Sequence, residues 1–154
     1  MRLYTYFRSS AAFRVRIALN LKGLNYESIA VSLPKGVHRE DGFGAINGQR
    51  LIPALVDEGH TLTQSLAIIE YLEEEHAHPP LLPKDSLGRA RVRSLALLVA
   101  CEIHPMNNLR VLQHLKLALG QHEARINAWY HHLVAEGVAH YERARGNTAG
   151  AARC

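Results

Sequence analysis

Three residue pairs in this sequence have types and positions that could do chemistry: Ser9-Ser10, Ile52-Pro53 and Gln64-Ser65. The first and third pairs each precede a segment with helical periodicity. Free N–H groups and the helix dipole at such a position favour an anion. A serine hydroxyl there can also donate to a thiolate and lower its pKa. The plain alternative for each pair is a helix cap with no further role.

The Ile52-Pro53 pair opens a short strand-like segment. Proline cannot donate to a strand ladder, so we expect it at a strand start or a sheet edge. A cis bond is possible there, although the residues alone favour a trans proline. In a β-α-β-β-α order, the loops that carry all three pairs come to one side of the sheet.

The elements that must position these pairs can be read from hydrophobic periodicity. Residues 3–7 and 26–31 are strand-like, and residues 11–22 are typical of a helix that ends at Gly23. The glycine-rich segment 33–49 predicts a loop with one irregular helical turn. Residues 54–56 and 61–63 predict a hairpin. We expect a helix from Ser65, as its cap, to about residue 75. The expected apolar faces of the two helices are Phe13, Ile17 and Leu21, and Leu66, Ile69 and Leu72.

The second half of the chain predicts helices only. Residues 76–85 contain three prolines and predict a linker. Residues 86–119 predict a helix that Pro105 kinks. Residues 121–143 predict a further helix with Ile126, Trp129, Leu133 and Val134 on one side. Residues 145–154 have no hydrophobic period, and we expect them to be disordered.

Composition excludes several classes of function. The chain has 154 residues, 47% of them hydrophobic, and no apolar run approaches the roughly 20 residues that span a membrane. It starts directly in a strand-like pattern, so we expect a cytoplasmic protein. Cys101 and Cys154 form no CxxC, which argues against a redox or metal site. The net charge of +4 comes from scattered arginines with no nucleic-acid motif. A diffuse positive field suits a small anionic substrate.

The segments 6–10 (YFRSS), 14–19 (RVRIAL), 52–55 (IPAL) and 64–73 (QSLAIIEYLE) resemble the signatures of zeta-class glutathione transferases. That class contains the maleylacetoacetate and maleylpyruvate isomerases. The resemblance runs from residue 1 to about residue 141. It implies a thioredoxin-like α/β domain over residues 1–78 and then an all-α glutathione-transferase domain over residues 86–144, in a homodimer. It also implies that the Ile52-Pro53 bond is cis.

The resemblance also assigns roles to individual residues. Ser9 or Ser10 stabilises the glutathione thiolate, Ile52 pairs with the peptide part of glutathione, and Gln64-Ser65 hold its γ-glutamyl carboxylate. The segment 103–110 is similar to the bacterial maleylpyruvate isomerase branch, which carries histidines at the positions of His38 and His104. His104 and Asn108 lie four residues apart and so share one face of the predicted helix. The other residues implied to contact glutathione are Gln49, Pro53 and His38. Arg8 and Arg110 are implied to bind the dianionic substrate.

The implied reaction is a cis–trans isomerisation of maleylpyruvate or maleylacetoacetate, with a modest preference for maleylpyruvate from His38 and His104. A glutathione thiolate adds to the alkene, the carbon–carbon bond rotates, and elimination returns glutathione. The arginines stabilise the carboxylates and the developing enolate.

Two features depart from the family pattern. Ala11-Ala12 stand where many zeta-class proteins have a cysteine after the serine pair. Family members also continue with further helices beyond the position of residue 141, whereas the segment 143–154 resembles a shifted reading frame. We therefore expect a truncated helical domain. Two alternatives to the isomerase stay open: a glutathione-binding protein without turnover, and a non-catalytic interaction module.

Overall fold

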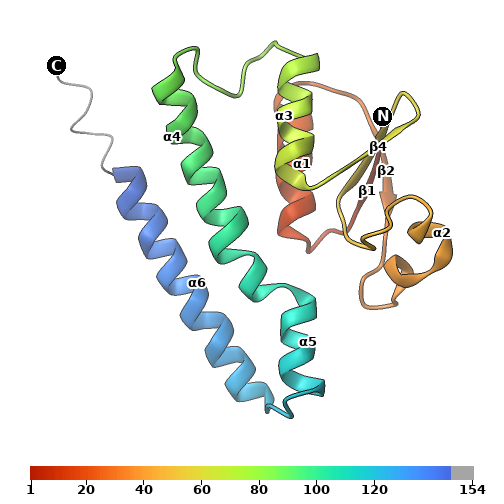
Figure 1. Ribbon diagram of the computed structural model, residues 1–154, viewed down its shortest axis with the longest axis vertical. Coiled ribbons are helices and arrows are strands. Elements are labelled where there is room, and N and C mark those ends of the chain that lie inside the picture. Colours follow the sequence, from red (N-terminus) through yellow and green to blue (C-terminus); the bar gives the residue numbers. More distant parts are fainter. Residues whose placement is uncertain (147–154) are drawn as a thin grey trace. The chain divides into compact units, whose positions relative to one another are not determined.

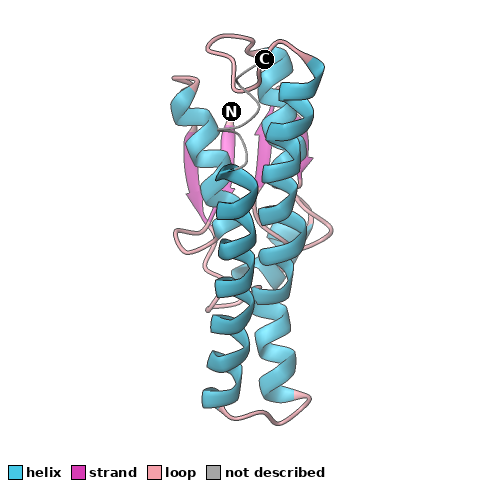
Figure 2. Ribbon diagram, turned by 90° about the vertical axis from the view of Figure 1, so that its left-hand side faces the viewer, coloured by secondary structure: helices cyan, strands magenta, loops and turns pink. Residues whose placement is uncertain are grey.

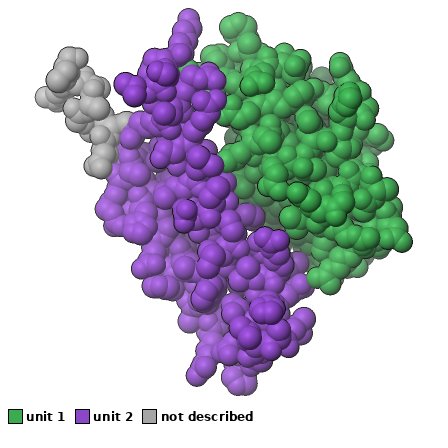
Figure 3. Space-filling view, viewed as in Figure 1, with its two compact units in different colours: residues 1–83 green, residues 84–154 purple. Residues whose placement is uncertain are grey.

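The computed structural model describes residues 1–146, and the chain divides into two compact units. The first unit is Met1–Pro83 and the second begins at Lys84 (Figure 3). Unit 1 mixes strands and helices, and the described part of unit 2 is helical (Figure 2).

Unit 1 is built on a four-stranded sheet with the order β2-β1-β3-β4 (Figure 1). The strands are β1 (Arg2–Thr5), β2 (Glu27–Ala30), β3 (Ala54–Asp57) and β4 (His60–Thr63). β1 runs parallel to β2 and antiparallel to β3, and β3 runs antiparallel to β4. The sheet and its helices have the predicted β-α-β-β-α order, which confirms the thioredoxin-like architecture.

Local sequence signals set the ends of these elements. α1 (Ser10–Leu21) starts after its cap Ser9, and Gly23 follows its end at φ +66°. The β3–β4 hairpin turns through Glu58 and Gly59, which both have positive φ, as a tight hairpin turn requires. The glycine-rich segment forms two short turns, η1 (Val37–Arg39) and α2 (Asp41–Gly44).

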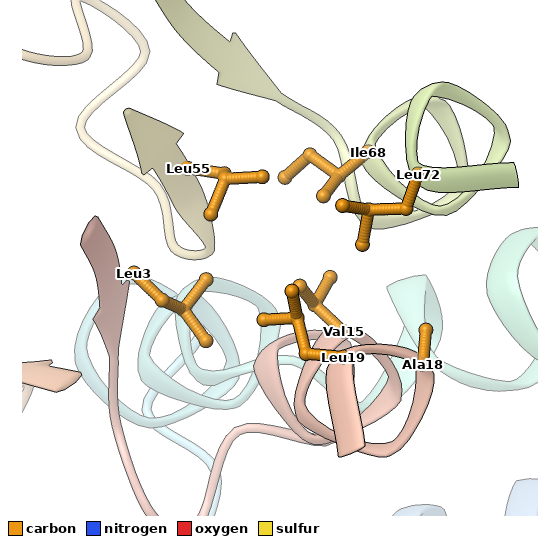
Figure 4. Packing of buried hydrophobic residues seen from close by; sticks show 7 residues of the cluster. All are labelled: Leu3, Val15, Ala18, Leu19, Leu55, Ile68 and Leu72. Carbon is orange, nitrogen blue, oxygen red and sulfur yellow. The ribbon is translucent and has the colours of Figure 1, made fainter. Parts of the chain in front are cut away.

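The core of unit 1 lies between the sheet and the pair formed by α1 and α3 (Ser65–Glu75) (Figure 4). The sheet contributes Leu3 and Leu55, and the helices contribute Val15, Ala18, Leu19, Ile68 and Leu72. Leu3, Leu55, Ile68 and Leu72 have no exposed surface. This cluster fixes both helices on the sheet.

The predicted apolar face of α1 was wrong. Phe13, Ile17 and Leu21 are 54%, 42% and 60% exposed, while the buried side of the helix contains small alanines. The same side carries the fully buried Val15 and Leu19. Alanine lets the helix approach the sheet closely, so the face that packs on the sheet is the one with alanines beside Val15 and Leu19. On α3, the deeply buried residues are Ile68 and Leu72, and Leu66 is only half-buried.

Unit 2 places two helical segments side by side in opposite directions (Figures 1 and 2). The first segment is α4 (Ser86–Leu97) followed by a π-helical stretch, η2 (Leu98–Ile103). After a break, α5 (Leu109–Leu117) follows, and α6 (Glu123–Gly146) packs back along η2. The predicted kink is a full interruption, the turn η3 (Pro105–Asn107).

α6 includes positions 145 and 146, which the sequence assigned to the disordered tail. The rest of that predicted tail, residues 147–154, lies outside the described residues. Across residues 1–146, none of the helices has the length and apolar character needed to cross a membrane.

Candidate functional site

The first candidate group is the turn between β1 and α1. The backbone N–H of Ser9 donates to the Tyr6 carbonyl at 3.0 Å, which closes this turn. The Ser9 hydroxyl oxygen accepts from the Ala12 N–H at 3.2 Å and so caps α1. A hydroxyl that accepts in this way still has its own hydrogen to donate. Ser9 is half-buried, and Ser10, the first residue of α1, is exposed.

Arg16, to which the sequence analysis gave no role, donates hydrogen bonds to three consecutive residues at the end of β1 and in this turn. Its Nη1 donates to the Thr5 hydroxyl at 2.6 Å and to the Tyr6 carbonyl at 3.3 Å. Its Nη2 donates to the Phe7 carbonyl at 3.3 Å. An arginine between the apolar residues Val15 and Ile17, in a predicted helix that follows a turn, was the available signal.

The second group is the loop before β3. The Ile52-Pro53 bond is cis, as the resemblance implied, and Pro53 is buried. Asn47, which the sequence analysis did not name, is 4% exposed and organises the loop. Its side chain donates to the Leu51 carbonyl at 2.6 Å and accepts from the Gln49 N–H at 3.0 Å. An asparagine in a glycine-rich loop is a typical turn-forming residue.

The third group lies at the start of α3 and joins the second. The side-chain Nε2 of Gln64 donates to the side-chain Oε1 of Gln49 at 3.0 Å. Gln64 has φ +67°, a strained conformation for a residue other than glycine. No side chain of the described residues caps α3, so its first N–H groups are available to an anion.

Ser65 is not the cap of α3, contrary to the prediction. It is the first helical residue and is 6% exposed, and its hydroxyl oxygen accepts from Arg14 Nη2 at 3.0 Å. The capping position is taken by Gln64, whose φ of +67° and ψ of +113° lie outside the helical region. The serine therefore links α3 to α1.

His38 lies in η1 and is half-buried. Burial lowers its pKa below the ordinary value of 6.5, and the nearby charge of Arg39 lowers the pKa further. The imidazole is therefore neutral at pH 7. Its Nδ1 is buried and has no hydrogen-bond partner among the described residues. This orphan nitrogen fits the ligand contact that the resemblance implies for His38.

The predicted residues of unit 2 do not share one helical face. His104 lies between η2 and η3, whereas Asn108 is extended and caps α5. The side-chain Oδ1 of Asn108 accepts from the N–H groups of Arg110 at 3.1 Å and Val111 at 3.2 Å. The break at Pro105 separates the two residues. Arg110, in the first turn of α5, is exposed, as Arg8 is in unit 1.

Comparison with known proteins agrees with this architecture. Residues 8–75 match the glutathione S-transferase N-terminal domain family. The chain is 51% identical over 142 residues to maleylpyruvate isomerase of Ralstonia, covering 92% of this chain and 67% of that protein. It is 49% identical over 150 residues to maleylacetoacetate isomerase of Pseudomonas aeruginosa, covering 96% of this chain and 70% of that protein.

Solved structures agree as well. A holo structure of maleylpyruvate isomerase, a bacterial zeta-class glutathione S-transferase, has a TM-score of 0.90 at 50% identity, covering 93% of this chain and 68% of that one. Maleylacetoacetate isomerase from Methylobacterium extorquens AM1, with bound malonate and glutathione, has a TM-score of 0.88 at 44% identity, covering 90% and 65%. The chain thus spans about two thirds of the length of these relatives.

A thioredoxin-like unit with a cis proline, followed by a helical unit, is the architecture of a glutathione S-transferase. The chain belongs to the zeta class of this family, the group of the maleylpyruvate and maleylacetoacetate isomerases.

Proposed function

We propose that this chain binds glutathione and uses it as the cofactor of a cis–trans isomerase that acts on maleylpyruvate or maleylacetoacetate. The observation that carries the proposal is the hydrogen-bonded link between the loop before cis-Pro53 and the start of α3, made by Gln49 and Gln64. Identities near 50% to isomerases of these two substrates support the same activity.

The residues of unit 1 fit glutathione. The uncapped start of α3, together with Gln64 and Ser65, offers N–H and O–H donors that suit the γ-glutamyl carboxylate. The backbone of Ile52, beside the cis proline, is a hydrogen-bonding partner for the peptide part. The neutral imidazole of His38 has a buried nitrogen without a partner among residues 1–146. From unit 2, we propose that His104 and Asn108 also bind glutathione.

Bound glutathione supplies a thiolate that adds to the substrate double bond, so that the bond can rotate before elimination. We assign the donor to that thiolate to the half-buried hydroxyl of Ser9, whose oxygen accepts from the Ala12 N–H and whose hydrogen is therefore available. The exposed Ser10 is the second candidate donor. The exposed guanidinium groups of Arg8 and Arg110 carry no acidic partner in the described structure and suit the two carboxylates of the substrate.

The test is glutathione-dependent loss of the maleylpyruvate enol absorbance. We expect turnover in the wild-type chain and a loss of about a hundredfold or more in the Ser9→Ala, Ser10→Ala double variant. Ser94→Ala, which removes an exposed hydroxyl of α4, is the matched control and should keep full activity. A parallel assay with maleylacetoacetate decides between the two substrates.

Other outcomes separate the alternatives. Soluble protein that binds glutathione without turnover would contradict the isomerase and leave a glutathione-binding protein. Failure to bind immobilised glutathione would leave only an interaction module. We further propose a cytoplasmic homodimer that acts in aromatic degradation, such as the gentisate route, and light scattering of the purified chain tests the dimer.

A further inference from the structure

We propose that two arginines of α1 are positioning residues of the glutathione site and that each controls a different property of it. Arg16 sets the serine turn and through it the pKa of the glutathione thiol. Arg14 sets Ser65 and through it the affinity for glutathione. The inference rests on the proposed function.

Arg16 and the backbone of Ser9 share one hydrogen-bond acceptor. The Tyr6 carbonyl accepts from the Ser9 N–H at 3.0 Å and from Arg16 Nη1 at 3.3 Å. Two hydrogen bonds through this shared carbonyl therefore link the guanidinium to the backbone of Ser9. Its contacts to the Thr5 hydroxyl and the Phe7 carbonyl hold the residues on both sides of Tyr6.

The ring of Phe7 contacts that of its neighbour Tyr6 edge-on, with the centroids 4.8 Å apart, but is otherwise open to solvent. Phe7 is 75% exposed. A hollow of about 350 Å³ lies against the turn, and its lining includes Tyr6, Phe7 and Arg16. Because a hollow provides no packing contacts, the three Arg16 hydrogen bonds restrain Thr5, Tyr6 and Phe7 on this side of the turn. A guanidinium with two separate nitrogens suits three acceptors at fixed positions.

Arg14 contacts the start of α3, where the proposed carboxylate contact lies. Its Nη2 donates to the hydroxyl oxygen of Ser65 at 3.0 Å, across 51 residues of sequence. That bond occupies an acceptor position on the oxygen, so the hydroxyl hydrogen points elsewhere and is available to a carboxylate. Ser65 is 6% exposed, which limits other orientations of its hydroxyl.

The spacing of Arg14 and Arg16 on α1 explains why the two side chains contact different parts of the site. They are two residues apart on α1, so their side chains leave the helix about 200° apart. One reaches the turn before α1 and the other reaches the start of α3. A single helix thereby ties the proposed thiol contact and the proposed carboxylate contact to the same rigid element.

The experiment measures two properties in the same variants of the full chain. Ultraviolet absorbance of the bound thiolate against pH gives the thiol pKa, and calorimetry gives the glutathione Kd. For Arg16→Gln we expect a thiol pKa about one unit higher, which is about tenfold less thiolate at a given pH, with a Kd changed by less than about twofold. For Arg14→Gln we expect a Kd raised about tenfold with an unchanged thiol pKa.

Three variants complete the test. Arg16→Lys keeps the charge but has one terminal nitrogen in place of two, so we expect its thiol pKa to rise by at least about half of the rise seen in Arg16→Gln. Thr5→Val removes one acceptor of Arg16 and should raise the thiol pKa by a smaller amount, which keeps the test decisive if Arg16→Gln does not fold. Arg2→Gln, an exposed arginine of β1, is the control and should change neither property.

Full restoration of the thiol pKa by lysine would mean that charge alone acts, and it would overturn the positioning role of Arg16. Equal effects of the Arg14 and Arg16 substitutions on Kd, with no movement of the thiol pKa, would reduce both to general stability and overturn the inference. A wild-type chain that does not bind glutathione would instead overturn the proposed function, and the inference with it.

Discussion

Replacing Lys22 by methionine should destabilise unit 1 strongly, because this lysine is a buried cation with every donor in use. Its side chain has no exposed surface. Its Nζ lies 2.7 Å from Glu73 Oε2 and donates to the carbonyls of His76 at 2.6 Å and Pro79 at 3.1 Å. One ammonium thus ties the end of α1 to α3 and to the segment that follows α3.

The expected loss follows from what methionine leaves behind. Glu73 keeps the N–H groups of Leu81 and Leu82, at 3.0 to 3.1 Å, but loses its cation while its side chain remains only 10% exposed. Removing one partner of a buried ion pair costs about 3–5 kcal/mol. For a chain of this length, that corresponds to a fall in Tm of about 6–20 °C.

The pH dependence of stability tests the same pair, Lys22 and Glu73, a second time. Burial raises the pKa of Glu73, but the bonds from Lys22, Leu81 and Leu82 outweigh burial and hold this pKa below its ordinary value of 4.5. A lowered pKa means that Glu73 stabilises the fold above about pH 4.5 and that this contribution is lost as pH falls through the lower folded pKa. Lys22→Met removes the main cause of the lowering, so the variant should lose less stability on acidification.

Urea unfolding followed by circular dichroism measures both effects, with Lys35→Met as the matched control at an exposed lysine. The double variant Lys22→Met, Glu73→Gln should recover part of the loss, because it leaves no buried charge unpaired. A loss below about 1 kcal/mol for Lys22→Met would place the pair among solvent-screened surface bridges and refute the reasoning.

Two further predictions concern other parts of the fold. A Cβ added at Gly137 would lie 2.4 Å from Ile103 Cγ1, so Gly137→Ala should lower the free energy of unfolding of unit 2 by about 1–3 kcal/mol in urea denaturation. Gly146→Ala, in the same helix with open space around it, should not be destabilising, and an equal loss in both variants would contradict the packing argument. A hydrogen bond to Asp57, above all other causes, raises the pKa of Tyr71 to about 12, and Asp57→Asn should return it toward 10.0. Titration of ring-labelled tyrosine by NMR checks this shift, and no change in Asp57→Asn would show that the bond is not its cause.

The order of elements in unit 1 could be predicted from the sequence, because its signals are local. Ser9 before α1, Gly23 after it and Glu58-Gly59 between β3 and β4 act on neighbouring backbone groups. The cis form of Ile52-Pro53 came only from resemblance to a family, since the residues alone favoured trans.

The tertiary structure alone decided which residues meet. Arg14 reaches Ser65 across 51 residues, and Gln64 reaches Gln49 across 15, so no local pattern could pair them. The tertiary structure also decided which face of α1 is buried. It showed that Asn108 caps α5, whereas the sequence predicted a residue on a helix face. Helical period shows that residues share a side, but the partner that packs there determines whether the side is buried. The three residue pairs could thus be identified in the sequence. The contacts of Arg14 with Ser65 and of Arg16 with the turn before Ser9 could not.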